Sequence, residues 1–175
     1  MSWIALQPME TATGKTREIY ELVAGMMGRV PEAMQLFGHS PILMEYMNTR
    51  FAYFHGQQQD LTPELMRWIL FLNARRKACV YCIDYNKGQL LASGISEEIL
   101  EAAAQDPQST PLPEKEKTML LFVLDAARDD KSVTQEKIDA VRRAGYSDAA
   151  IFNAMEFTAF ATFSDTLLNV FQVES

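Results

Sequence analysis

The sequence is poor in the residues that build metal sites and disulfide frameworks, since its 175 residues include only two cysteines and two histidines. Two cysteines exclude the cross-linked framework of a small secreted domain. Neither His39 nor His55 has finger-like spacing to them, which disfavours a zinc site. Strand signals are also lacking, because no segment alternates convincingly between apolar and polar residues and no hairpin dipeptide occurs. No glycine-rich phosphate loop or Ser-His-Asp arrangement is visible, so no sequence motif supports nucleotide binding or serine hydrolase activity.

Basic residues are fewer than acidic ones, 16 against 23, and the net charge is −7. This charge repels nucleic acid and anionic membranes, so we expect neither as a partner. The most apolar stretch, residues 149–170, fails as a membrane span because polar side chains interrupt it, namely Asn153, Glu156, Ser164 and Asp165. The amino-terminal residues lack the basic start, apolar run and cleavage site of a signal peptide, and we therefore expect a cytoplasmic protein.

The patterns that are present have a helical period. Residues 16–27 place apolar side chains at steps of three and four, and Ser40 and Thr62 each precede a proline that can begin a helix. Ser132 to Gln135 fit a capping box. Together the patterns predict helices over residues 16–27, 31–36, 41–54, 63–76, 78–91, 97–104, 114–128, 133–143 and 148–171. The expected fold is all-α. We expect one domain over residues 1–175, with a linker at 105–113, where three prolines occur, between two helical halves.

Cys79 and Cys82 are the most informative residues of the chain. They lie three residues apart in a predicted helix, so that they share a face and approach closely enough to form a disulfide. Cys79 falls near the helix start, where unpaired amides favour a thiolate, and the run Arg75 to Lys77 adds positive potential. We therefore expect Cys79 to be the attacking or partner-facing sulfur and Cys82 the second member of a redox pair. The spacing leaves open which cysteine meets peroxide first.

Two other interpretations of the pair apply. Both cysteines could be buried structural thiols, and composition alone does not separate that interpretation from a redox role. A thioredoxin-type site is disfavoured, because no βαβ pattern surrounds the pair.

Arg67 interrupts a predicted helix that is apolar on nearly all sides and is therefore expected to be buried. A buried guanidinium needs a carboxylate or several acceptors, because an unpaired buried charge is very costly. Glu156, the one acid in the apolar stretch 151–163, is the candidate partner. We expect Arg67 to pair with Glu156, or with a neighbouring subunit, beside the cysteines. The alternative is a structural ion pair remote from any chemistry.

The segment from Leu61 to Asn86, LTPELMRWILFLNARRKACVYCIDYN, resembles the alkylhydroperoxidase D branch of the carboxymuconolactone decarboxylase-like family. That branch shows a leucine-x-proline helix start, a glutamate and a Cys-x-x-Cys-x-x-x-His motif. Residues 12–20, 30–31, 39–41 and 144–147 also look like the family, so the resemblance spans nearly the whole chain. It implies an all-helical fold, homotrimers or trimer-based assemblies, and reduction of a peroxide substrate by the two cysteines. No cofactor is required, and a reducing thiol protein or small dithiol would restore the pair.

The resemblance breaks at the two positions that complete the family's proton relay. Arg67 replaces the glutamate twelve residues before Cys79, and Asn86 replaces the histidine four residues after Cys82. A permanently charged guanidinium cannot act as a base, although it could lower the pKa of a nearby thiol. The amide of Asn86 can orient a thiol or a bound water but cannot exchange a proton near neutral pH.

These departures favour a slow antioxidant peroxidase of the peroxiredoxin type, or thiol exchange with another substrate. The competing interpretation is a non-catalytic oligomeric binding or scaffold protein that kept the fold after losing the relay.

Overall fold

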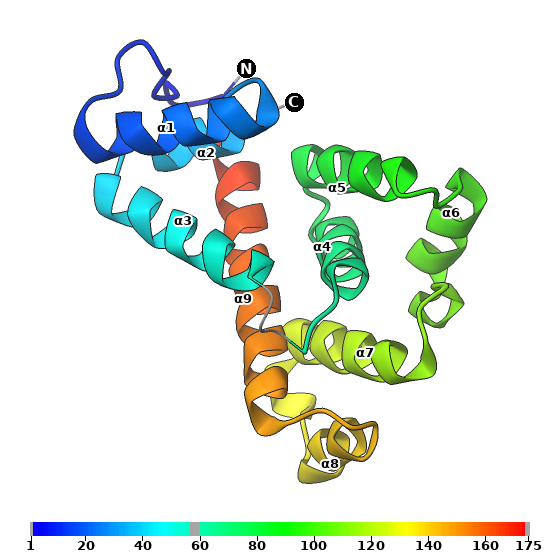
Figure 1. The fold of residues 1–175 in the computed structure, drawn as a ribbon. Coiled ribbons are helices and arrows are strands. Elements are labelled where there is room, and N and C mark those ends of the chain that lie inside the picture. Colours follow the sequence, from blue (N-terminus) through cyan, green and yellow to red (C-terminus); the bar gives the residue numbers. More distant parts are fainter. Residues whose placement is uncertain (1, 57–59, 174–175) are drawn as a thin grey trace. The chain divides into compact units, whose positions relative to one another are not determined.

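The protein is described by a computed structural model that covers residues 2–56 and 60–173, and among these residues it shows helices and no strand. Every predicted helix is found, with ends that agree to within two residues, and the expected all-α fold is confirmed. In chain order the elements are α1 (Gly14–Met27), α2 (Glu32–Phe37), α3 (Pro41–His55), α4 (Pro63–Lys77), α5 (Val80–Ala92), α6 (Glu97–Gln105), η1 (Pro107–Ser109), α7 (Glu114–Arg128), η2 (Asp130–Ser132), α8 (Gln135–Arg143) and α9 (Asp148–Val170) (Figure 1).

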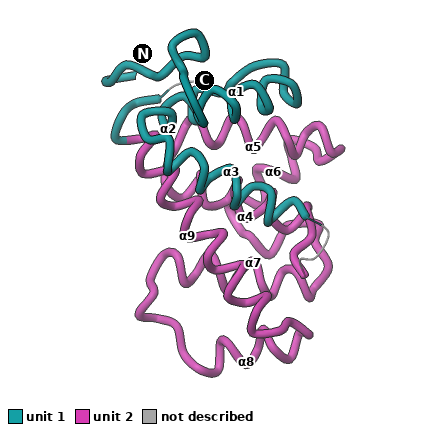
Figure 2. Tube along the Cα trace, turned by 60° about the vertical axis from the view of Figure 1, so that its left-hand side comes forward, with its two compact units in different colours: residues 1–58, 170–175 teal, residues 59–169 magenta. Residues whose placement is uncertain are grey.

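The chain divides into two compact units (Figure 2). Unit 1 comprises residues 1–58 and 170–175, and unit 2 comprises residues 59–169. The expected linker at 105–113 is therefore wrong as a boundary, because it lies inside unit 2. Its prolines make it compact: η1 contacts α6 and α7, and both Thr110 and Leu112 are buried. The assignment of residues 1–175 to one domain stays a prediction.

Unit 1 is built on α3, which contacts α1 and α2. The buried face of α1 includes Ile19, Tyr20 and Val23, at the helical spacing seen in the sequence. The Tyr20 hydroxyl lies 3.1 Å from the carbonyl oxygen of Gln7 and 3.2 Å from that of Met34. Burial raises the pKa of Tyr20 to about 12, so the hydroxyl stays neutral and serves as a buried cross-link in this unit.

Unit 2 is organised around α4, which contacts α5, α6 and α7 (Figure 1). Thr62 caps its start, because the threonine hydroxyl accepts the N–H of Leu65 at 3.1 Å, and Pro63 occupies the first helical position. Trp68 and Phe71 on its buried face are each 1% exposed. Burial of one such side chain is worth about 1.5–3 kcal/mol, so α4 is the main contributor to the core of this unit.

Helix α9 presents a stripe of mostly small buried side chains at steps of three or four residues, which lets a neighbouring helix approach closely. The stripe consists of Ala150, Ala154, Thr158, Ala161, Asp165 and Leu168. Polar side chains join α9 to α4, since Asn169 donates to the carbonyl of Lys77 at 2.8 Å and Asp165 accepts from Asn73. Although α9 is long, no helix of the described chain has both the length and the apolar character needed to cross a bilayer.

Four helix starts differ from the sequence prediction by one or two residues, and two of these differences, at α5 and α8, change the predicted helix caps. Helix α5 begins at Val80, so Cys79 is its N-cap and lies outside the helix. Helix α8 begins at Gln135 and is capped by Thr134, whose hydroxyl accepts the N–H of Lys137 at 3.4 Å. The proposed capping box at Ser132 is wrong, because Ser132 closes η2 by donating to the carbonyl of Asp129.

Candidate redox site

Cys79 and Cys82 are joined by a disulfide at the start of α5, with their Cα atoms 5.2 Å apart. The turn between α4 and α5 places them there, because Ala78 adopts a left-handed conformation with φ 51° and closes α4. The Sγ of Cys79 accepts the backbone N–H of Cys82 at 3.4 Å. In the reduced protein the same amide would stabilise a thiolate on Cys79, as expected for a cysteine at a helix N-terminus.

Both cysteines are buried, with Cys79 1% and Cys82 7% exposed. Their surroundings are polar as well as apolar, because Asn86 and Asp165 are buried with them. Of the two residues, Cys82 is the slightly more exposed one in the oxidised protein. Of the three basic residues at positions 75–77, Arg75 forms an ion pair with Glu101 at 3.4 Å, which reduces its positive potential at the cysteines.

Asp165 brings a carboxylate to the disulfide that our sequence analysis did not assign to the site. One carboxylate oxygen of Asp165 and the sulfurs of Cys79 and Cys82 all lie within 4.8 Å of one another. The sequence held a signal for this residue, because Asp165 falls on the stripe of α9 that begins at Ala150 and Glu156 does not. An acid on the buried stripe of a helix needs a polar partner, and Asn73 in the apolar helix α4 is that partner.

Asn73 holds Asp165 in place and links it to the protein surface. Fully buried, Asn73 donates from Nδ2 to Oδ2 of Asp165 at 2.7 Å. Its Oδ1 accepts from Nη2 of Arg76 at 2.8 Å and lies 3.1 Å from the Thr162 hydroxyl. The amide orientation is therefore fixed, and Asn73 must present its donor to Asp165.

Burial raises the pKa of Asp165 from 3.8 to about 6. The hydrogen bond from Asn73 and the positive charges of Lys77 and Arg76 oppose this rise, but they do not cancel it. A carboxyl group with a pKa near 6 can both release and accept a proton close to neutral pH. The disulfide therefore lies next to a carboxyl group that could exchange protons with the cysteine thiols.

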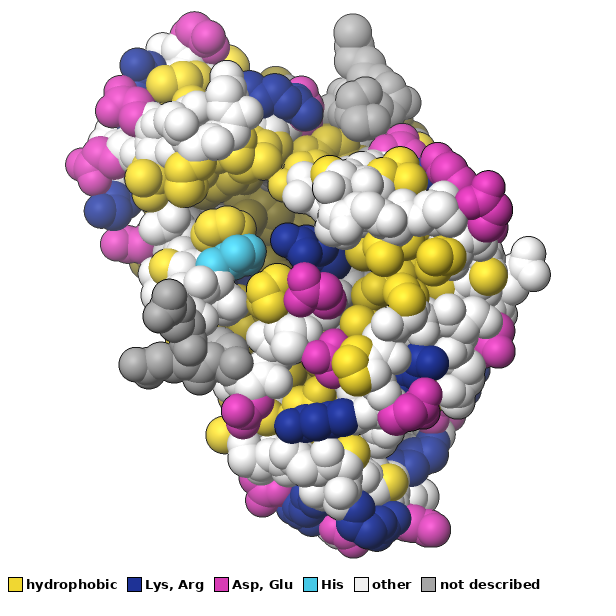
Figure 3. Space-filling model, turned by 45° about the vertical axis from the view of Figure 1, so that its right-hand side comes forward, with side chains coloured by type: hydrophobic (Ala, Val, Ile, Leu, Met, Phe, Trp, Pro, Cys, Tyr) yellow, Lys and Arg dark blue, Asp and Glu magenta, His cyan; other side chains and the backbone are white. Residues whose placement is uncertain are grey.

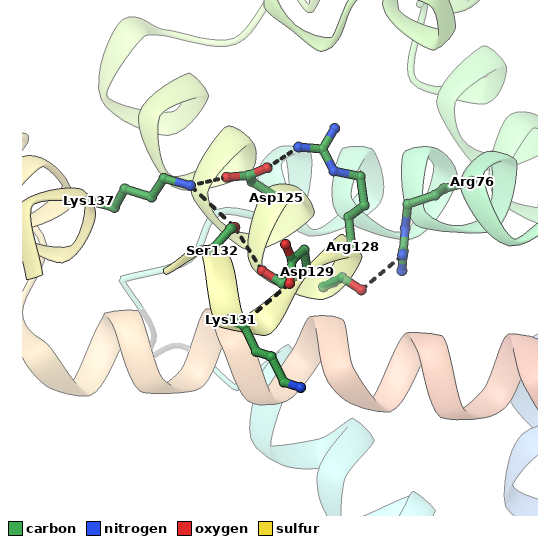
Figure 4. Close-up of polar contacts among 8 residues, drawn as sticks. Arg76, Asp125, Arg128, Asp129, Lys131, Ser132 and Lys137 are labelled. Carbon is green, nitrogen blue, oxygen red and sulfur yellow. Dashed lines mark hydrogen bonds and ion pairs between the residues drawn. The ribbon is translucent and has the colours of Figure 1, made fainter. Parts of the chain in front are cut away.

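A groove of about 930 Å³ opens beside the turn that carries the cysteines. Its walls come from α4 to α8 and are mainly apolar, with Ala78, Ile83, Leu121 and Phe122 among them. Figure 4 shows its polar part, in which the Asp125 carboxylate accepts from both Lys137 and Arg128, while Arg76 donates to the carbonyl of Ala127 at 2.9 Å. Arg76 thus faces the groove and also contacts the Asn73–Asp165 pair.

Comparison with known proteins identifies the fold. No family model and no curated protein matches the sequence. An uncharacterized peroxidase-related protein from Ralstonia eutropha JMP134, described as an alkylhydroperoxidase AhpD core, superposes with a TM-score of 0.84 at 18% identity over 99% of this chain and 91% of its own. A peroxidase-related protein from Silicibacter sp. TM1040 gives 0.85 at 15% identity over the same shares. The chain has the AhpD-like helical fold.

The AhpD-like fold is not restricted to one reaction. The debrominase Bmp8, in complex with 2,3,4-tribromopyrrole, superposes with a TM-score of 0.72 at 16% identity over 99% of this chain and 93% of its own. Since one fold can host several chemistries, the activity must be argued from the residues at the disulfide.

Asn86 lies one turn after Cys82 in α5, and its side chain bonds the backbone of that residue. Its Nδ2 donates to the carbonyl of Cys82 at 2.7 Å, and its side chain is buried. This contact steadies the first turn of α5. Asn86 therefore helps to hold the backbone of Cys82 in place. Its amide does not exchange protons near neutral pH, so it does not replace the histidine of the relay.

Arg67 differs from the prediction. It is only half-buried, with a side chain 36% exposed, and its ion pair is with Glu64 at 3.6 Å, one turn earlier in α4. The expected pairing with Glu156 is therefore wrong, and the alternative of a partner on a neighbouring subunit stays a prediction. The physical reason is that α4 is buried on a broad face rather than all round, so that Arg67 shares a solvent-facing stripe with Glu64. Glu156 is half-buried on α9.

The two histidines lie in unit 1 and bond backbone carbonyls. The Nε2 of His39 is 2.6 Å from the Ala5 oxygen, and the Nδ1 of His55 is 2.9 Å from the Phe51 oxygen. Within the described residues, no histidine joins a cluster of metal-binding side chains. The sulfurs beside Asp165 are bonded to each other and offer no thiolate, so we identify no metal site there.

Proposed function

We propose that this protein is a thiol-dependent peroxidase of the peroxiredoxin type, which reduces peroxides through a dithiol–disulfide cycle of Cys79 and Cys82. The observation that carries the proposal is the disulfide itself, formed across the Cys-x-x-Cys at a helix N-terminus with a titratable carboxylate nearby. Two thiols in this arrangement can oxidise and be reduced without rearrangement of the helices.

The chemistry needs no cofactor. One cysteine thiolate attacks a peroxide oxygen, the O–O bond breaks, and the cysteine becomes a sulfenic acid. The other cysteine then attacks the sulfenic sulfur, the disulfide forms and water leaves. A reducing thiol protein or small dithiol returns both cysteines to thiols. We place this cycle in the cytoplasm, where such reductants are maintained.

We further propose that the protein works as a homo-oligomer, a trimer or a multiple of one. Support comes from large apolar side chains that are exposed in the single chain, including Ile42 at 76% and Phe152 at 70%. Figure 3 shows that apolar side chains gather in several places on the face it draws. Exposed apolar surface of this kind is typical of subunit contacts.

A second candidate function is a non-catalytic oligomeric scaffold in which the disulfide is structural. The burial of both cysteines favours it, because a peroxide must reach the sulfur of a residue that is at most 7% exposed. The two functions differ in one respect, which is whether the pair exchanges electrons in the folded protein.

Peroxide consumption with a dithiol reductant separates the two functions. We expect the wild-type protein to consume peroxide catalytically, and Cys82→Ser to lose turnover because its sulfenic acid cannot be resolved within the chain. Cys79→Ser is the matched variant for the other sulfur. If neither substitution changes the rate of peroxide loss, the redox function is excluded.

A further inference from the structure

We propose that Asp165 is the proton-transfer residue of the Cys79/Cys82 cycle, supplied by α9 in place of the glutamate and histidine that Arg67 and Asn86 replace. This inference rests on the proposed redox function. Its geometric basis is that an Asp165 carboxylate oxygen lies within 4.8 Å of both sulfurs. That separation allows a direct proton transfer after small adjustments, or a transfer through one water.

The hydrogen bonds of Asp165 leave one oxygen available for this task. Oδ2 accepts from Asn73, and within the described part of the chain no hydrogen bond engages Oδ1. Asn73 is itself held by Arg76 and lies close to Thr162, so the carboxylate is oriented from two helices. The group is therefore positioned before the reaction rather than during it.

The polar groups that interact with Asp165 or with the backbone of Cys82 cannot transfer protons in its place. Asn73 and Asn86 carry amides, which do not exchange protons near neutral pH. Arg76 is permanently charged, and Lys77 acts on Asp165 as a second positive charge from α4. Among these neighbours, Asp165 alone combines proximity to both sulfurs with a carboxyl group whose pKa lies near 6.

In the oxidising direction, the Asp165 carboxylate takes the proton of the attacking thiol. The thiolate then attacks the peroxide, the O–O bond breaks, and the departing alkoxide receives that proton as an alcohol. Asp165 next takes the proton of the second thiol, which attacks the sulfenic sulfur. The leaving hydroxide receives this proton and departs as water. Two thiols and one hydroperoxide thus yield a disulfide, an alcohol and water, with Asp165 unchanged.

In the reducing direction, the protonated form of Asp165 is required. A thiolate of the reductant attacks one sulfur, the S–S bond breaks, and the other sulfur leaves as a thiolate that takes the Asp165 proton. The second thiol of the reductant then gives its proton to the Asp165 carboxylate and attacks the mixed disulfide, and the leaving cysteine thiolate takes that proton. Asp165 regains its own proton from water, which received one when the first reductant thiol ionised. Both cysteines end as thiols, and the reductant ends as a disulfide.

The test measures how fast dithiothreitol reduces the disulfide between about pH 5 and about pH 8, with each rate divided by the dithiothreitol thiolate concentration. For the wild type we expect this rate constant to fall about tenfold per pH unit above the Asp165 pKa, until an unassisted pathway takes over. In Asp165→Asn we expect it to be about a hundredfold lower at acidic pH and independent of pH.

Two further variants separate proton transfer from a structural role. Asp165→Glu keeps a carboxyl group and should restore a pH-dependent rate. Asp148→Asn removes an exposed carboxylate from the first turn of α9, about 25 Å along the helix, and should leave the wild-type profile intact.

The outcomes of this test are distinct. A flat wild-type profile overturns the role of Asp165 without any variant, and so does an Asp165→Asn profile that matches the wild type. In either case the proposed function survives if peroxide still converts both thiols to the disulfide. A folded protein whose reduced thiols ignore peroxide defeats the proposed function instead.

Discussion

Replacement of Asp165 by asparagine is expected to stabilise the oxidised protein at neutral and alkaline pH. The substitution keeps the size of the side chain and an oxygen that can accept from Asn73, while it removes a buried charge. The pKa of Asp165 is about 6 in the folded protein against 3.8 for the ordinary group. This difference corresponds to about 3 kcal/mol of folding free energy lost at high pH.

The sign follows from proton binding. Because burial raises the pKa, the folded protein holds a proton between pH 3.8 and about 6 that the unfolded chain has released. The contribution of Asp165 to stability is therefore fully present below pH 3.8 and is lost as the pH rises through about 6. Asp165→Asn has no such loss, so its advantage over the wild type should grow between pH 3.8 and about 6 and stay constant above that range.

Urea unfolding of the oxidised proteins at about pH 4 and about pH 8 measures the effect. We expect the two proteins to have nearly equal free energies of unfolding at the lower pH and to differ by about 3 kcal/mol in favour of Asp165→Asn at the higher pH. Asp148→Asn is the control. The hydrogen bond and ion pair with Arg142 lower the pKa of Asp148, so its removal should lower the free energy of unfolding at the higher pH, where Asp165→Asn should raise it. An equal difference between wild type and Asp165→Asn at both pH values would show that the ionisation of Asp165 does not affect stability.

Three further substitutions test the elements that position the site, each by the change in the free energy of unfolding. Ala78→Gly should stabilise the protein by about 0.5–1 kcal/mol, because glycine adopts the left-handed conformation before Cys79 without strain; a destabilised variant would contradict this. Leu100→Ala should cost about 2–5 kcal/mol, since Leu100 is 0% exposed, and a loss below that range would show that the core refills the cavity. Thr62→Ala should cost about 1 kcal/mol through loss of the α4 cap, and no loss would show that the cap is dispensable.

The helices were predictable because their signals are local. Thr62-Pro63 marks a helix start through side-chain capping and a fixed proline φ, and the helix begins there. Helix α3 likewise begins at Pro41, but the Ser40 side chain makes no capping hydrogen bond, so the proline alone supports that start. The disulfide was also predictable, since two cysteines three residues apart at a helix N-terminus have few other geometries available.

The contacts between helices were predicted less well, because they depend on which stripe of each helix is buried. Arg67 was assigned to a buried face on the apolar character of its neighbours, and it lies on the exposed stripe beside Glu64. Asp165 was passed over in favour of Glu156, although it shares the spacing of Ala154, Thr158 and Ala161. Which acid of α9 lies near the cysteines depends on which positions of the helix are buried, and the composition of the helix does not show this.

The most direct test of the account is a count of free thiols in the folded, reduced protein before and after one equivalent of peroxide. We expect the thiols of Cys79 and Cys82 to disappear together and dithiothreitol to restore both. Two thiols that persist in the folded protein, inert to peroxide and to alkylating reagents alike, would contradict it.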